Sequence, residues 1–92
     1  MPEPVATRTV VVANRMGMHA RPALLIVTLA RKFDANVEII KGNLRVDAKE
    51  MLHVMMLGAD HGEQLVLEAT GPDAQGAVEA LEELFERKFD ED

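Results

Sequence analysis

The chain has 92 residues, of which 48% are hydrophobic, enough for one domain with a packed core. It contains no Cys, which excludes disulfides, thiolate nucleophiles and thiolate metal sites and is consistent with a reducing compartment. The formal net charge is −6 and neither Trp nor Tyr occurs, so a nucleic-acid-binding role is disfavoured, because such proteins need basic patches and stacking aromatic rings.

The N-terminal segment shows no targeting signal. Its longest apolar run, Val10 to Ala13, is too short for a signal peptide or a membrane span. We therefore expect a cytoplasmic protein without direct membrane insertion. The charges are uneven: residues 1–49 hold eight Lys/Arg and four Asp/Glu, whereas residues 50–92 hold two and twelve. Such polarity can orient a docking partner.

The first half of the chain predicts a strand, a helix and a hairpin. Residues 9–12 are β-branched and predict a strand. A loop around Gly17 follows, and then apolar residues at helical spacing predict a helix over residues 20–33. Pro22 fits the first turn of this helix, where its missing N–H costs nothing. Residues 37–40 and 44–46 predict two strands of a hairpin.

The second half predicts a short helix in "AKEMLHVMMLG", ended by Gly58, then a strand over residues 64–69 and a last helix opened by Gly71-Pro72-Asp73. The acidic end, residues 90–92, is expected to fray. The order βαββαβα indicates an α+β fold, an open-faced β-sandwich whose four-stranded antiparallel sheet carries three helices on one face, in a single domain over residues 1–92. The expected core residues of the helices are Ala23, Ile26, Val27, Ala30, Phe33, Val54, Leu57, Ala77, Val78, Leu81, Leu84 and Phe85.

The segment "GMHARPA", residues 17–23, places a histidine where the first strand gives way to the first helix. A neutral imidazole is a good nucleophile towards phosphorus. At a helix N-terminus, a phosphoryl group on His19 would lie near unpaired backbone N–H groups and the positive end of the helix dipole. Arg21 could bind the same phosphate oxygens. The segment therefore suits a site that carries a phosphoryl group.

Other interpretations of His19 are a helix cap, a solvated surface residue or a metal ligand. The metal interpretation lacks a second ligand within helical reach, and we expect no metal and no cofactor. A free-standing hydrolase is disfavoured because the chain has no Ser or Cys nucleophile and no phosphate-binding Gly-rich loop.

"GMHARPA" resembles the active-site motif of the HPr family, the histidine phosphocarriers of the phosphoenolpyruvate-dependent phosphotransferase system. The resemblance covers nearly the whole chain in the same element order and includes "KEMLHVMMLG" and "LEATGPDAQGAVEALEELF". It implies that His19 takes a phosphoryl group on Nδ1 from the phosphohistidine of enzyme I and passes it to an enzyme IIA-type acceptor. Arg21 and the backbone amides of Ala20 and Arg21 would stabilise this group. The protein would be a carrier and co-substrate rather than a catalyst in its own right.

The resemblance leaves alternatives open. The motif and the ending "FDED" are similar to the nitrogen branch of the system, while "VMMLG" is shared widely in the family, so both the sugar and the nitrogen branch stay open. A non-transferring regulatory module of the same fold, acting by protein contact, is the other functional reading. Regulatory relatives of that kind typically lose the active histidine, whereas His19 and Arg21 are both present. We expect a monomer.

The helix predicted over residues 20–33 and the short helix predicted in "AKEMLHVMMLG" each contain more apolar residues than a single buried stripe needs. Exposed apolar patches often mark partner sites, and Met suits surfaces that accept several partners. A wider core or a dimer contact is the alternative. By resemblance, these helices are where enzyme I and the acceptors dock. The surplus residues are Leu24, Leu25, Leu29, Met51, Leu52 and Met55.

Glu50 stands where many members of the family carry a regulatory serine, so phosphorylation by a kinase is excluded at this position. Its charge favours a helix N-terminus, and a cap role is expected, with partial mimicry of phosphoserine as the weaker alternative. His53 is expected on the exposed face of the central helix and His61 in a turn, both without a direct role. Lys49 and Arg15 could add positive potential around His19 or be ordinary solvated charges.

Overall fold

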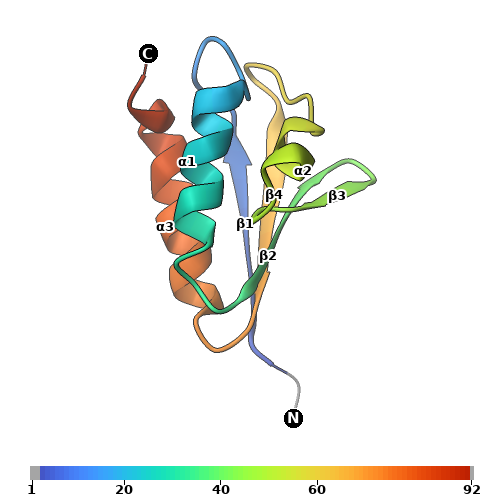
Figure 1. The fold of residues 1–92 in the computed structure, drawn as a ribbon, viewed down its shortest axis with the longest axis vertical. Helices are drawn as coiled ribbons and strands as arrows, with labels where there is room; N and C mark the ends of the chain where they lie inside the picture. The colour runs from blue at the N-terminus through green and yellow to red at the C-terminus, as the bar shows by residue number, and fades with distance from the viewer. Residues whose placement is uncertain (1–2, 92) are drawn as a thin grey trace.

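The computed structural model describes residues 3–91; Met1, Pro2 and Asp92 lie outside the described residues. Within this range no helix is long and apolar enough to cross a membrane. Figure 1 shows the arrangement of the elements. They are β1 (Val5–Val11), α1 (Ala20–Ala30), β2 (Asn36–Lys41), β3 (Leu44–Asp47), α2 (Met51–Met55), β4 (Gln64–Thr70), α3 (Ala74–Glu86) and a one-turn 3-10 element, η1 (Lys88–Asp90).

The strands form one four-stranded antiparallel sheet in the order β1-β4-β2-β3. Central strand β4 pairs with β1 in a register that sets Val10 opposite Leu65, and with β2 in a register that sets Ile39 opposite Leu67. Because side chains alternate across a strand, one face of the sheet is apolar and buried and the other is polar. The predicted α+β fold with helices on one face is confirmed.

Helices α1 and α3 lie side by side over the apolar face of the sheet, and α2 lies beside α1 near β3 (Figure 1). Of the expected core residues, all are buried except Phe33, which is half-buried beyond the end of α1. Helix α1 ends at Ala30 because Asp34 and Ala35 turn the chain towards β2. The Asp73 carboxylate fixes this turn by accepting hydrogen bonds of 2.8 Å from both of their backbone N–H groups.

Contrary to the expectation of a frayed acidic end, residues 88–91 are folded onto the domain. Phe89 is fully buried, and its ring contacts Phe85 edge to face, with ring centroids 4.8 Å apart. Lys88, Phe89 and Asp90 all have positive φ, so the chain makes a left-handed turn immediately after α3. Burial of one aromatic ring therefore offsets an unfavourable backbone conformation, and it brings Glu91 back to the start of α1.

Candidate functional site

His19 immediately precedes α1, with extended backbone angles of φ −90° and ψ −173°. Its side chain makes no capping hydrogen bond to the helix, so the interpretation as a helix cap is wrong. The side chain is 32% exposed, which leaves the ring open to approach from solvent. Its position at the end of the β1–α1 loop agrees with the sequence prediction.

The loop that carries His19 is held by backbone contacts to the segment before β4. The Met18 N–H donates to the carbonyl of Ala59 at 2.8 Å. Gly17 has φ +69°, and a Cβ atom at this position would lie 2.8 Å from the same carbonyl oxygen. Both the backbone conformation and the close packing therefore require glycine here.

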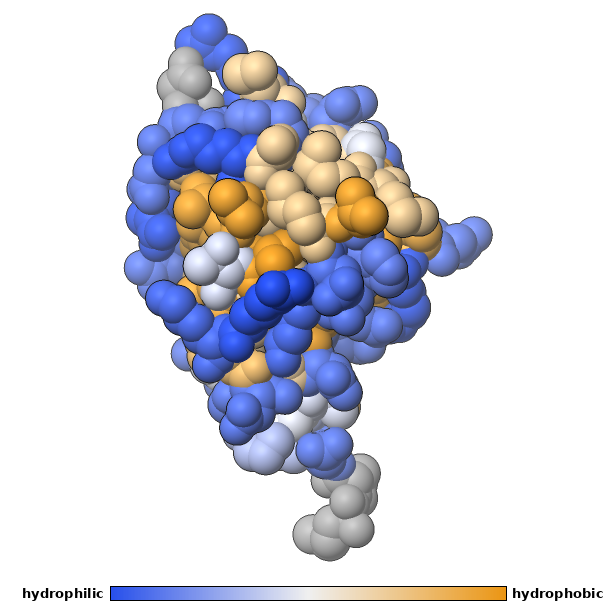
Figure 2. All heavy atoms as spheres, viewed as in Figure 1, coloured by the Kyte–Doolittle hydropathy of each residue, from blue (hydrophilic) through white to orange (hydrophobic). Residues whose placement is uncertain are grey.

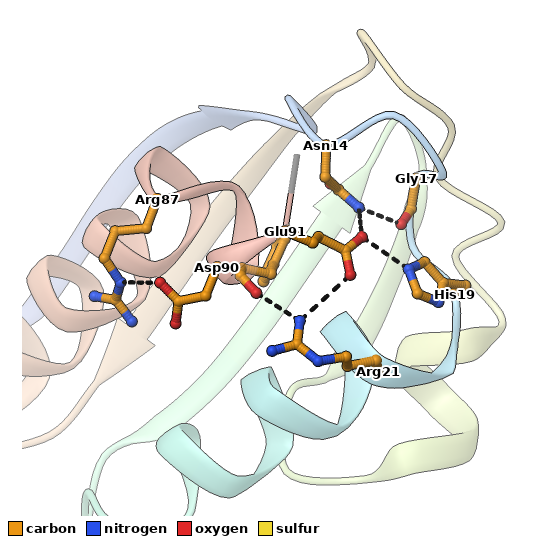
Figure 3. Close-up of polar contacts among 8 residues, drawn as sticks. Asn14, Gly17, His19, Arg21, Arg87, Asp90 and Glu91 are labelled. Carbon is orange, nitrogen blue, oxygen red and sulfur yellow. Dashed lines mark hydrogen bonds and ion pairs between the residues drawn. The ribbon is translucent and has the colours of Figure 1, made fainter.

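The carboxylate of Glu91 lies at the centre of the site (Figure 3). Its Oε1 is 2.8 Å from Nε2 of His19 and accepts a hydrogen bond of 3.0 Å from Nδ2 of Asn14. Its Oε2 accepts a hydrogen bond of 3.3 Å from the Arg21 guanidinium. The hydrogen bond from His19 is the main cause that lowers the pKa of Glu91, and Asn14 and Arg21 lower it further. Glu91 is therefore ionised at neutral pH.

Arg21, in the first turn of α1, reaches the C-terminal turn as well as Glu91. Its Nη1 donates to the carbonyl of Phe89 at 2.7 Å. The side chain remains 51% exposed, so it is also accessible to a ligand at His19. Ala20 is exposed, and the backbone N–H groups of Ala20 and Arg21 lie in the helix turn that has no intrahelical acceptors. The predicted phosphate-stabilising groups thus lie together next to His19.

Asn14 and Glu91 are site residues that sequence reasoning missed. Asn14 is fully buried and also donates to the carbonyl of Gly17 at 2.7 Å, while its Oδ1 has no partner among the described residues. Buried polar side chains are generally hydrogen-bonded. An Asn three residues before a loop glycine was therefore a local signal that the side chain of Asn14 could hold this loop. Glu91 is 72 residues from His19 and gave none.

An apolar patch covers the outer side of α1 and α2 beside the site, as Figure 2 shows on this face of the molecule. Leu24, Leu52 and Met55 are exposed as predicted, by 56%, 78% and 38%. Leu25, Leu29 and Met51 are half-buried and pack against the core, so the alternative of a wider core holds for these three. Sequence reasoning missed Met16 and Met56, which are 75% and 65% exposed.

Glu50 occupies the N-cap position of α2, but its side chain makes no capping hydrogen bond. It instead pairs with Arg31, with a distance of 3.4 Å between Nη2 and Oε2, and both side chains are more than half exposed. Glu50 therefore lies at the helix N-terminus where its charge was expected, without a hydrogen bond to the first turn. Lys49 donates to the carbonyl of Phe33 at 2.7 Å, so it is held at the opposite end of α1 from His19.

The remaining candidates lie on α2 and in two loops of the fold. His53 is exposed on α2, where its Nδ1 is 3.5 Å from the backbone N of Asp47, and His61 is exposed in the turn before β4. Arg15 is exposed in the loop that precedes His19. Over residues 3–91, no group of three or more His, Cys, Asp or Glu side chains is arranged to hold a metal ion.

Comparison with known proteins assigns this site to a family. Residues 6–87 match the family model described as "PTS HPr component phosphorylation site". The chain is 43% identical over 88 residues to the phosphocarrier protein HPr of Treponema pallidum, covering 96% of this chain and all of the relative. It is 38% identical to the phosphocarrier protein NPr of Escherichia coli K12 over 92% of this chain and 96% of that one.

The solved structures agree. The crystal structure of HPr-C-His from Thermoanaerobacter tengcongensis matches with a TM-score of 0.91 and 39% identity, covering 95% of this chain and 98% of that one. This chain belongs to the HPr family of the phosphotransferase system, and its role is that of a phosphocarrier.

Proposed function

We propose that this protein accepts a phosphoryl group on Nδ1 of His19 from phosphorylated enzyme I and passes it to an enzyme IIA-type acceptor. The observation that carries the proposal is the partly exposed His19 ring at the start of α1, with Arg21 and the first-turn N–H groups around it. Anions bind well at such a helix end, because the N–H groups are unpaired and the dipole is positive.

The group transfer needs no catalytic side chain other than the histidine itself. The lone pair of Nδ1 attacks phosphorus while the P–N bond in enzyme I breaks, and its electron pair returns to the enzyme I ring. Transfer onward repeats the exchange with the acceptor in place of His19. Arg21 and the amides of Ala20 and Arg21 hold the phosphate oxygens, so the chain lowers the energy of the phosphorylated state by charge and hydrogen bonding.

We assign docking of both partners to the apolar patch on α1 and α2. Its exposed members lie on the helix that begins at His19 and on the neighbouring helix, so a partner seated there is close to the phosphorylated ring. Exposed Met side chains can adapt to two different partners in turn. The patch residues are Met16, Leu24, Leu52, Met55 and Met56, with Leu25 and Met51 partly buried at its base.

The test is a reconstituted transfer assay. The protein is incubated with phosphoenolpyruvate and enzyme I from the same organism, then with an enzyme IIA-type acceptor, and acid-labile phosphate is followed on each protein. We expect phosphate on the wild-type chain, its passage to the acceptor, and complete loss of both in His19→Ala. Absence of phosphate on the wild-type chain, with an enzyme I that phosphorylates another HPr, would contradict the proposal and favour regulation by contact.

A further inference from the structure

We propose that Glu91 is a positioning residue that keeps the proton of the His19 ring on Nε2 and so directs phosphorylation to Nδ1. This inference rests on the proposed function and concerns a residue at the far end of the chain, held 2.8 Å from the ring. It explains why the last described residue is folded back onto the start of α1.

The carboxylate of Glu91 decides which ring nitrogen carries the proton. An ionised carboxylate only accepts hydrogen bonds, and Glu91 already accepts two others, from Asn14 and Arg21. The contact between Oε1 and the ring therefore requires a hydrogen on Nε2. In a neutral imidazole the other nitrogen then carries the lone pair, and the partner of one nitrogen sets the state of the other.

Nδ1, the other ring nitrogen, points away from Glu91 (Figure 3), and within residues 3–91 no hydrogen bond to it is formed. The unprotonated nitrogen is therefore the accessible one, whereas Nε2 is covered by Glu91, whose own side chain is only 20% exposed. Glu91 itself is held by Asn14, which is fully buried, so the acceptor is fixed relative to the ring.

The Nε2 proton stays on the ring throughout the transfer. When Nδ1 takes the phosphoryl group, the ring keeps its proton on Nε2 and becomes a cation bearing a phosphoryl group. The negative charge of Glu91 stabilises this cation. When the P–N bond breaks again, its electron pair returns to Nδ1 and the ring leaves as neutral imidazole. No proton has to move in either direction, whereas loss of the Nε2 proton would make the leaving ring an anion.

The other charged and titratable groups on the elements around the site come from four segments. Arg21 extends from α1, Arg15 lies in the preceding loop, and Asp60 and His61 lie in the segment against which Gly17 packs. Asp90 is the neighbouring acid in the C-terminal turn, and its carboxylate pairs with Arg87 at 3.2 Å. Among the hydrogen bonds of the described residues, the imidazole of His19 pairs with the Glu91 carboxylate alone. Asp90→Asn therefore makes a matched control with the same loss of charge.

The experiment phosphorylates the purified protein chemically with potassium phosphoramidate, which transfers its phosphoryl group to imidazole and releases ammonia. Phosphorus NMR distinguishes the Nδ1 and Nε2 isomers. We expect about a tenfold or greater excess of the Nδ1 isomer at His19 in the wild type and in Asp90→Asn. Glu91→Gln and Glu91→Ala should lose most of this excess. Equal isomer ratios in all four proteins, or a wild-type product that is mainly the Nε2 isomer, would overturn the inference.

A second readout is the pH profile of phosphoryl transfer from the phosphorylated protein to an enzyme IIA-type acceptor. In Glu91→Gln we expect the rate to decline at a pH about one unit lower than in the wild type, because the Nε2 proton is held less firmly. A residue that only anchors the C-terminus would leave the profile in place, and a profile unchanged in both Glu91 variants overturns the inference. The phosphoramidate reaction uses no partner protein, so its outcome is separate from failure of the proposed function.

Discussion

The two ends of α1 each carry an Arg–Glu pair of similar length, and the two pairs differ in the burial of the carboxylate and in the number of its donors. At the first end, Glu91 is 20% exposed and takes hydrogen bonds from three side chains. At the other end, Glu50 is 57% exposed and meets Arg31 at 3.4 Å. Exposed pairs contribute little because water screens them.

The difference shows what a folded-back chain terminus can add to a site. The pair at the far end of α1 joins two neighbouring elements on the surface. The cluster at His19 joins the β1–α1 loop, the helix and the C-terminal turn, and the buried Phe89 ring fixes that turn. Partial burial and several donors, rather than the Arg–Glu pairing itself, make the first cluster able to control a ring nitrogen.

The largest expected effect comes from removing the anchor of the C-terminal turn. Phe89→Ala removes a fully buried ring that contacts Phe85, and we expect it to lower the free energy of unfolding by about 3–5 kcal/mol. It should also release Glu91 from His19, so that the carboxylate at the first end of α1 becomes as exposed to water as Glu50 at the other end. Urea unfolding measures the first effect, and a loss below about 1 kcal/mol would show that the turn is not anchored by this ring.

Gly17→Ala perturbs the loop on the other side of the same cluster. The new Cβ would lie 2.8 Å from the carbonyl oxygen of Ala59 in a left-handed backbone conformation, so we expect a loss of about 1–3 kcal/mol and slower phosphorylation. Gly58→Ala is the matched control, because Gly58 also has positive φ but nothing within 4 Å of its Cβ position. Equal losses of stability in the two variants would contradict a role for close packing at Gly17.

Leu52→Glu tests whether the apolar patch on α1 and α2 is the docking surface. Leu52 is 78% exposed, so stability should change by less than about 0.5 kcal/mol, while affinity for enzyme I should fall about tenfold or more. Leu44→Glu on β3, where the side chain is 39% exposed, should leave this affinity unchanged. Calorimetry measures the affinity of each variant for enzyme I. Equal affinities of Leu52→Glu and Leu44→Glu would show that enzyme I docks elsewhere.

The pH dependence of stability should report on the Glu91 carboxylate. The folded state lowers the pKa of Glu91, mainly through the hydrogen bond from His19, so its contribution is present above the unfolded-state pKa of about 4.3. It is lost as the pH falls through the lower folded-state pKa. The stability difference between wild type and Glu91→Gln should therefore shrink below about pH 4. A difference that stays constant from pH 7 to pH 3 would contradict this linkage.

The smallest expected effect is at Glu50. Glu50→Ser should change the free energy of unfolding by less than about 0.5 kcal/mol, because the pair with Arg31 is exposed and α2 is not capped by this side chain. We also expect unchanged affinity for enzyme I. A marked gain in affinity would instead support the interpretation of Glu50 as a partial mimic of phosphoserine.

Local patterns predicted the elements of this protein well, because apolar periodicity reports which side chains face the core. The predicted helix over residues 20–33 was too long because a tertiary contact, from Asp73 to the turn after α1, decides its end. The strand at residues 9–12 was too short because pairing with β4 extends β1 to Val5. Such long-range contacts do not alter the spacing of apolar residues within a segment, so the spacing does not predict them.

Only the local part of the site could be predicted, because long-range contacts leave no local sequence signal. His19, Ala20 and Arg21 form one short motif, and the structure places them together as the motif implies. Glu91 was missed because nothing local connects it with His19, and the acidic ending suggested fraying. Phe89 immediately precedes that ending, and its burial reverses the expectation for Asp90 and Glu91.

The most direct test of the account is to find the atom that carries the phosphate after reaction with enzyme I and phosphoenolpyruvate. Protein labelled with nitrogen-15 in its three His side chains allows the P–N bond to be identified by phosphorus–nitrogen coupling. The account predicts a single coupling, to Nδ1 of His19. Coupling to Nε2, to His53 or to His61, or the absence of any phosphohistidine, would contradict it.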